Sequence, residues 1–95
     1  MSDYVIDPGY ELIKLQAVTL ANDSTKVVVD KGTPFFIINT GNATMYIGPN
    51  AAQCTTPGLP IYQGGQQGPY SSAKGEMYMR GTALQTAVIS YVQGV

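Results

Sequence analysis

Short runs rich in Val, Ile, Tyr, Phe and Thr alternate along the chain with clusters of Gly, Pro, Asn and Asp. The clearest runs lie at residues 26–29, 35–38, 44–47 and 76–80. β-branched and aromatic residues favour strands, and the clusters between them favour turns. Because the turns recur at short intervals, the pattern predicts an all-β sandwich or barrel.

The run at residues 76–80 shows the clearest alternation. Met77 and Met79 fall on one side of an extended chain, and the polar residues beside them fall on the other. Side chains of a strand alternate between its two faces, so this run predicts a half-buried strand.

The runs at residues 35–38 and 44–47 are the best-marked pair. The turn-forming segment from Asn39 to Asn42 lies between them. Two strand-like runs joined by such a short segment predict a β-hairpin.

Two other segments fit a helix as well as a strand. Residues 10–20 contain good helix formers, with Ile13, Ala17 and Leu20 at helical spacing, yet they also alternate between apolar and polar positions. Residues 84–92 carry a helical stripe together with a β-branched bias. We expect a strand in both segments.

The chain shows no internal repeat or linker. Residues 1–9, which end in Pro8-Gly9, are predicted to form an extended N-terminal arm, and residues 10–95 a single domain. The glycine-rich segment at residues 64–69 lacks the Lys-Ser/Thr ending and the following helix of a phosphate-binding loop. We therefore expect a flexible loop there.

Charged residues form only 12% of the 95 residues, about half the usual quarter, and the net charge is −1. The five Lys and Arg are scattered, so the sequence offers no basic patch and nucleic-acid binding is not expected. The longest apolar run bearing on membrane insertion, at residues 35–38, is far shorter than the roughly 20 residues of a membrane span. The first residues do not resemble a signal peptide. We expect a soluble protein made in a cytoplasm and not bound to a membrane.

Few side chains are suited to catalysis. The chain has no His, the commonest general base and metal ligand. Cys54 is the single cysteine, so we expect a free thiol, with an intermolecular disulfide between assembled copies as the alternative. The six carboxylates show no clustered ligand spacing, although the spacing leaves open a pair formed across strands. We expect no enzymatic activity, no catalytic residue, no cofactor and no bound metal.

Tyrosine is the abundant aromatic residue, with seven Tyr and no Trp. Exposed Tyr is common in protein interfaces because it offers apolar area and one hydrogen bond at little entropic cost. Tyr46 and Tyr78 alternate with apolar residues and are expected to point outward; isolated, half-exposed tyrosines are the alternative explanation. The candidate interface residues are Tyr4, Ile6, Tyr10, Tyr46, Tyr62 and Tyr78.

A small β-sandwich with few charges has little to protect its sheet edges from pairing with other chains. We therefore expect a homo-oligomer or another assembly to cover these edges.

From Val18 onward, the order of turns and strands resembles a type of small structural protein found in the virions of tailed bacteriophages. The resemblance covers about four fifths of the chain. The residues that carry it are Val18-Thr19-Leu20, Thr25-Lys26-Val27, Phe36-Ile37-Ile38-Asn39-Thr40-Gly41, Met45-Tyr46-Ile47-Gly48, Thr56-Pro57-Gly58-Leu59-Pro60-Ile61, Glu76-Met77-Tyr78 and Val88-Ile89-Ser90-Tyr91-Val92.

The resemblance implies a compact antiparallel, jelly-roll-like β-sandwich of about seven to eight short strands, with no catalytic residues. It implies a bacteriophage virion protein made in the bacterial host cytoplasm. The version that we expect is a capsid decoration, or cement, protein on the capsid surface. Such a protein binds the major capsid protein by non-covalent contacts, as a homo-oligomer, with a trimer favoured, and its N-terminal arm orders against a neighbour.

The alternative is a carbohydrate-binding or adaptor module of a phage tail or head fibre. In that case Tyr46, Tyr62 or Tyr78 would stack on the sugar rings of a glycan.

Overall fold

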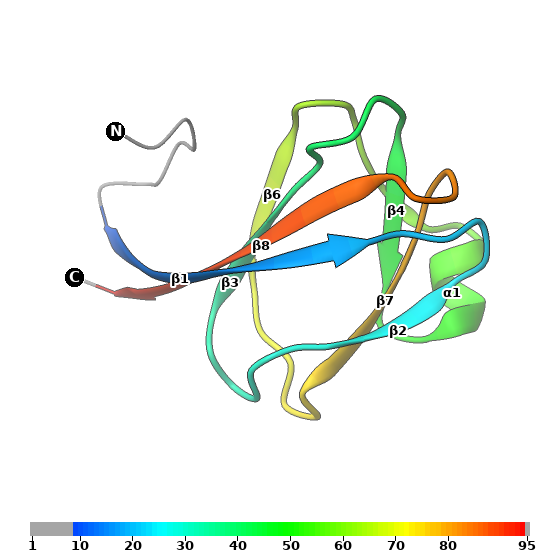
Figure 1. The fold of residues 1–95 in the computed structure, drawn as a ribbon. Coiled ribbons are helices and arrows are strands. Elements are labelled where there is room, and N and C mark those ends of the chain that lie inside the picture. Colours follow the sequence, from blue (N-terminus) through cyan, green and yellow to red (C-terminus); the bar gives the residue numbers. More distant parts are fainter. Residues whose placement is uncertain (1–8, 95) are drawn as a thin grey trace.

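The computed structural model describes residues 9–94. Within this range the chain forms eight strands and one short helix, which confirms the predicted all-β class (Figure 1). In chain order the elements are β1 (Tyr10–Thr19), β2 (Thr25–Val28), β3 (Phe35–Ile38), β4 (Met45–Gly48), α1 (Ala51–Thr55), β5 (Leu59–Ile61), β6 (Gln66–Tyr70), β7 (Glu76–Arg80) and β8 (Thr86–Gly94). No helix within the described range is long and apolar enough to cross a membrane.

The strands form two antiparallel four-stranded sheets. Sheet A has the order β1-β8-β3-β6, and sheet B has the order β2-β7-β4-β5. The first four strands thus pair with the last four in reverse order, β1 with β8, β2 with β7, β3 with β6 and β4 with β5. Wrapping such a folded ribbon into two sheets produces a jelly roll, so the predicted jelly-roll-like sandwich is confirmed.

The apolar core lies between the two sheets. In this core the ring of Phe35 on β3 meets the ring of Tyr91 on the neighbouring strand β8 edge-on, with the centroids 5.9 Å apart. Met77 and Met79 face this core as their alternation predicts. The core cluster consists of Leu20, Val29, Phe35, Ile37, Met45, Ile47, Ile61, Met77, Met79, Ala87, Ile89 and Tyr91.

Both segments with mixed signals are strands, as predicted. Strand β8 lies between β1 and β3, and most of its middle residues are buried. A central strand buried on both faces reads as a nearly continuous apolar run, which also fits a helix. Strand β1 lies at the edge of sheet A, and several of its apolar residues stay exposed, which weakens the alternation.

The predicted hairpin between residues 35–38 and 44–47 is wrong. Strand β3 pairs with β8 and β6 in sheet A, whereas β4 pairs with β7 and β5 in sheet B. Strand β3 lies in the interior of sheet A with β8 along one side and β6 along the other, so neither side is left for β4. The segment between β3 and β4 therefore crosses from one sheet to the other.

The expectation of a flexible loop at residues 64–69 is also wrong. Most of this segment belongs to β6, which pairs with β3 at the edge of sheet A. Pro69 is tolerated because an edge strand has one side without ladder hydrogen bonds. Gly68 has φ of 140°, and a Cβ there would lie 2.9 Å from the Phe35 carbonyl oxygen. The glycine therefore permits a close approach to β3 that the composition alone does not indicate.

The segment between β3 and β4 is held by a buried polar cluster around Asn39 and Gln85 rather than by the backbone hydrogen bonds of a hairpin. The Asn39 amide group donates to the carbonyl oxygens of Ala43 and Ile61, and its Oδ1 accepts from the Gly41 amide and from Gln85 Nε2. Asn39 is fully buried and Gln85 nearly so. These bonds satisfy the turn between β3 and β4 and join it to β5 and to the turn before β8.

The cluster predicts a large effect for Asn39→Ala, because four hydrogen bonds are lost and several partners stay buried without replacement. We expect the free energy of unfolding to fall by about 2 to 4 kcal/mol in urea titrations. Asn42→Ala, at an exposed position in the same turn, is the matched control and should change it by less than about 0.5 kcal/mol. Equal effects of the two substitutions would contradict the role assigned to Asn39.

Candidate interaction surfaces

The four candidate interface residues that the structure describes are not brought together on one surface. Tyr4 and Ile6, with most of the predicted arm, lie outside the described residues. Tyr10 begins β1, and its ring packs edge-on against Phe36 with the centroids 5.8 Å apart. Tyr62 follows β5 and is 68% exposed.

Tyr46 and Tyr78 lie on the neighbouring strands β4 and β7, on the face of sheet B that points away from the core. Both are half-buried rather than free. The Arg80 guanidinium lies over the Tyr46 ring, 4.0 Å from its centroid, and donates to the carbonyl oxygens of Cys54 and Thr55. One face of the Tyr46 ring is therefore already occupied.

Helix α1 covers part of this face and was not predicted from the sequence. Its signal is the N-cap Asn50, whose side chain accepts from the Gln53 amide at 2.9 Å. Cys54 on α1 is completely buried, with Sγ 3.6 Å from the Tyr46 carbonyl oxygen. Gly48 lets the helix approach, because a Cβ there would lie 2.5 Å from the Cys54 amide nitrogen. The burial of Cys54 disfavours a disulfide between folded copies.

The edge of β1 is the most prominent exposed surface that the strand order creates. This ten-residue strand is paired with β8 along one side, and it forms an outer edge of sheet A. Leu12, Ile13 and Leu15 are 37%, 49% and 50% exposed. A bulge separates residues 10–12 from a regular run at residues 14–19. We call this run and the three exposed apolar side chains the β1 edge.

The other three edge strands carry features that hinder pairing with another chain. Strand β6 contains Pro69 and a register shift, β5 has three residues with Pro60 in the middle, and β2 has four residues that include Lys26. Proline, short length and charge are the usual means by which proteins protect a sheet edge. The two charged side chains on β1 are both engaged within the chain: the Lys14 ammonium binds Asp30 at 2.7 Å, and the Glu11 carboxylate accepts from Gln93 Nε2 at 3.4 Å.

The outer face of sheet A continues the apolar character of the β1 edge. Leu15 on β1, Ser90 on β8 and Phe36 on β3 lie directly opposite one another in a row across the sheet. Phe36 and Val92 are buried although they lie outside the core cluster. The Ser90 hydroxyl is buried in this row, and no residue between 9 and 94 forms a hydrogen bond with it. The outer face of sheet A is therefore mainly apolar near β1.

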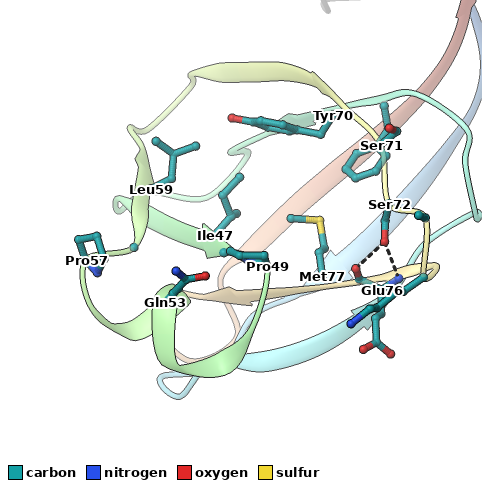
Figure 2. A pocket seen from close by; sticks show the side chains of 15 residues that line it. Ile47, Pro49, Gln53, Pro57, Leu59, Tyr70, Ser71, Ser72, Glu76 and Met77 are labelled. Carbon is teal, nitrogen blue, oxygen red and sulfur yellow. Dashed lines mark hydrogen bonds between the residues drawn. The ribbon is translucent and has the colours of Figure 1, made fainter.

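A pocket opens between the two sheets on the side where β6 and β5 form the edges (Figure 2). Its volume is about 700 Å³. Ile47, Leu59 and Met77 from sheet B face Tyr70 from sheet A across it, and Pro49 and Pro57 line its rim. Burial raises the pKa of the Tyr70 hydroxyl. The lining is thus mainly apolar, with a polar rim on one side.

One polar side chain of this pocket, that of Ser72, holds the loop between β6 and β7. The Ser72 hydroxyl donates to the Glu76 carbonyl oxygen and accepts from the amides of Gly75 and Glu76 (Figure 2). The Glu76 carboxylate lies 3.8 Å from the Lys26 ammonium. Within the described residues no three His, Cys, Asp or Glu side chains are close enough to hold a metal ion.

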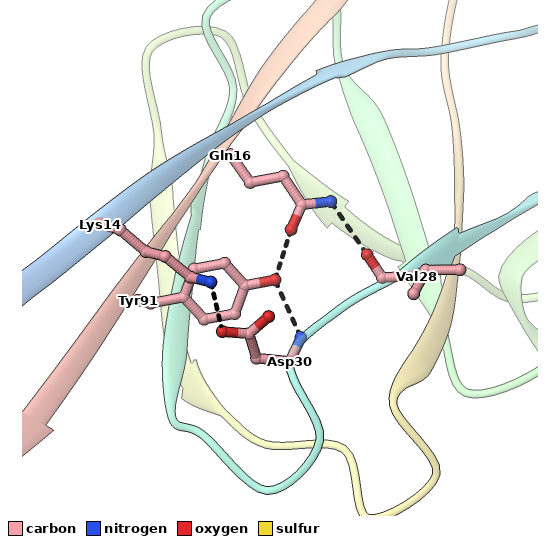
Figure 3. A network of polar contacts seen from close by, with 5 residues as sticks. All are labelled: Lys14, Gln16, Val28, Asp30 and Tyr91. Atoms are coloured by element: carbon pink, nitrogen blue, oxygen red, sulfur yellow. Dashed lines mark hydrogen bonds and ion pairs between the residues drawn. The ribbon is translucent and has the colours of Figure 1, made fainter.

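The opposite side of the sandwich, where β1 and β2 form the edges, is closed by a polar network (Figure 3). The Tyr91 hydroxyl donates to Gln16 Oε1 and accepts from the Asp30 amide at 3.0 Å. Gln16 Nε2 donates to the Val28 carbonyl oxygen at 2.9 Å. These bonds join sheet A to the end of β2. The two sides of the sandwich therefore differ: one is sealed and the other is open.

The turn between β7 and β8 displays an exposed apolar residue. Leu84 is 80% exposed and has φ of 66°, a left-handed conformation that costs a non-glycine residue roughly 1–2 kcal/mol. The turn is nevertheless held firmly, because the amides of Ala83 and Leu84 donate to the Asn22 side chain and the Leu20 carbonyl oxygen. The sequence pattern groups Leu84 with the apolar residues of the last strand and does not reveal this exposure.

Comparison of the chain with protein-family models, with curated proteins and with solved structures finds no match.

The network in Figure 3 predicts alkaline destabilisation. Burial raises the pKa of Tyr91 above 10.0, and the hydrogen bond to Asp30 raises the pKa of Lys14 above 10.5. Raised pKa values mean that the folded state holds these protons more tightly than the unfolded chain. Their contribution is therefore complete below the ordinary values and is lost as the pH rises through the higher folded-state values.

Tyr91→Phe tests this interpretation. At pH 7 it should lower the free energy of unfolding by about 1–3 kcal/mol, because Gln16 and the Asp30 amide lose a partner. Between pH 9 and 11.5 its stability should then fall less steeply than that of the wild type in urea titrations. Tyr62→Phe, at an exposed position, should follow the wild type throughout. An unchanged pH dependence in Tyr91→Phe would refute the assignment.

Proposed function

We propose that the chain is a structural protein of a bacteriophage virion, a decoration protein that binds the major capsid protein on the capsid surface. The observation that carries this proposal is the β1 edge. A ten-residue edge strand with three exposed apolar side chains is unusual in a free protein, because it invites pairing with other chains. In the assembled particle a capsid subunit covers it.

The contact uses the backbone of residues 14–19 and the side chains beside it. A strand of the partner adds to sheet A next to β1, so that main-chain hydrogen bonds supply affinity. Leu12 and Leu15 bury apolar area on the outer face of the sheet. The ion pair between Lys14 and Asp30 keeps the lysine from placing an unpaired charge in the contact.

The architecture and the composition support the same proposal. Jelly rolls occur among viral capsid proteins and lectins, so the fold supports the proposal by analogy. The low charge fraction of 12% suits a surface that stays in contact with other protein. The resemblance to phage virion proteins supplies the identity of the particle.

Glycan binding through the tyrosines has less support. Tyr46 and Tyr78 share the outer face of sheet B, but the Arg80 guanidinium lies over the Tyr46 ring. Tyr62 extends from the end of β5 beyond the strand pairing of sheet B. The three rings do not form one stacking platform.

The proposal predicts that the chain is present in many copies on phage particles. Particles are purified on a density gradient from an infected or induced culture of a bacterium in which the gene for this chain is found, and antibody-coupled gold against this chain is imaged on them. Gold should decorate heads. Particles that lack the chain, or that carry it on the tail alone, would contradict the proposal.

Leu15→Lys tests whether the β1 edge makes the contact. Added to particles stripped of this protein, the variant should bind at least about tenfold more weakly than the wild type, because the contact would desolvate its charge. Val28→Lys, at a 68%-exposed position on the short edge strand β2, is the matched control and should bind normally. Circular dichroism verifies that both variants fold. Normal binding of Leu15→Lys would exclude the β1 edge as the capsid contact.

A further inference from the structure

We propose that two copies of this chain pair through the free edges of their β1 strands, antiparallel about a two-fold axis. The pairing joins sheet A of one copy to sheet A of the other. It occupies the same β1 edge as the proposed contact with a capsid subunit, and it therefore decides when that edge is available. It does not depend on the identity of the particle.

Strand β1 is the edge strand best suited to pairing between copies. In the described part of the chain it pairs with β8 along one side, and no strand lies along the other (Figure 1). Strands β6 and β5 each contain a proline, and β2 spans four residues with a lysine among them. A contact between unlike edges would need one of these three strands. The remaining combination is β1 with β1, and a surface that binds its own copy does so about a two-fold axis.

The run at residues 14–19 is complementary to itself. It pairs with β8 without a register shift, so its free side is a regular strand edge. Residues that lie opposite each other in an antiparallel pair point to the same face of the sheet. With the axis at the middle of the run, beside Gln16 or Ala17, Leu15 of one copy therefore lies opposite Ala17 or Thr19 of the other. A large side chain thus meets a small one.

The pairing buries apolar side chains that the fold leaves exposed. Leu15 is 50% exposed, and Ala17, on the same face of β1, is also exposed. Leu15 continues the row formed by Ser90 and Phe36 on the outer face of sheet A. Strand pairing supplies main-chain hydrogen bonds, and Leu15 adds apolar area beside them.

No like charges from residues 14–19 meet across the pairing. Lys14 of one copy lies opposite Val18 or Leu20 of the other, according to the position of the axis, and not opposite its own counterpart. Its ammonium already binds Asp30 at 2.7 Å. Glu11 lies beyond the register shift and is engaged within its own chain. The repulsion by which charged residues protect a sheet edge is therefore absent from this run.

The pairing is weak and reversible. A contact limited to residues 14–19 of each strand is smaller than the roughly 1,200 Å² of a stable protein interface. Dilution therefore separates the copies and frees the β1 edge. A capsid subunit and a second copy cannot occupy the edge at the same time, so self-pairing protects the apolar edge from other chains until the particle is reached.

Opposite charges at position 17 test the pairing by sedimentation equilibrium. Ala17 faces its own counterpart, directly or diagonally, with either position of the axis. The mass of the wild type should rise with concentration from the 10.1 kDa of one chain toward twice that value. Ala17→Lys and Ala17→Glu should each associate at least about tenfold more weakly, because like charges meet near the axis. An equimolar mixture of the two should recover the wild-type mass, because lysine then faces glutamate.

The same substitutions on helix α1 control for the effect of charge alone. Ala52→Lys and Ala52→Glu, at an exposed position on the helix that packs on sheet B, should associate like the wild type. Circular dichroism verifies that the Ala17 variants fold, and recovery of the dimer in their mixture is a second measure of folding.

Four results would overturn the inference: a wild type that keeps the mass of one chain up to about 1 mM, a mass that the Ala17 substitutions leave unchanged, a mixture that stays monomeric, and the trimer that the resemblance favours. A monomeric wild type that still decorates phage heads would overturn this inference and leave the proposed function standing. Self-pairing that depends on position 17 in a chain absent from particles would do the reverse.

Discussion

The packing of sheet A on sheet B through side chains is the interaction on which the rest of the structure depends. Strands pair within sheet A (β1-β8-β3-β6) and within sheet B (β2-β7-β4-β5), and the two sheets share no strand pairing. Side chains and connecting loops must therefore set the position of one sheet on the other. Phe35 and Tyr91, which are opposite each other on β3 and β8 of sheet A, both belong to the core cluster between the sheets. Because the Tyr91 hydroxyl also reaches Gln16 and the Asp30 amide, the same residue seals one side of the sandwich (Figure 3).

The candidate interaction surfaces follow from this arrangement. The side that Tyr91 seals presents the β1 edge, whose lysine is held by Asp30. The other side stays open between β5 and β6 and forms the pocket. The cluster of Asn39 and Gln85 holds the turn that displays Leu84. The buried contacts thus determine which apolar side chains stay exposed to solvent. Exposed apolar side chains of this kind indicate contacts with other protein chains.

Local sequence patterns predict much of this fold, and their failures have a common physical cause. The alternation around Met77 and Met79 requires no knowledge of the partner strand and is confirmed. The hairpin from residue 35 to residue 47 is wrong because strand pairing here is non-local: β3 pairs with the distant β8. The exposure of Leu12, Ile13 and Leu15 depends on β1 lying at an edge, which no local pattern reveals. Gly68 and Pro69 indicate a loop, because the sequence does not reveal that β6 lies at the edge of a sheet, where both residues are tolerated.

Amide hydrogen exchange tests most directly the claim that this protein works by covering its sheet edge with another chain. Peptides from β1 are compared between the free protein and the protein bound to purified heads. The account predicts that protection of residues 14–19 rises by at least about tenfold on binding, while β8, already paired on both sides, changes little. Unchanged exchange in β1, with new protection confined to sheet B, would contradict it.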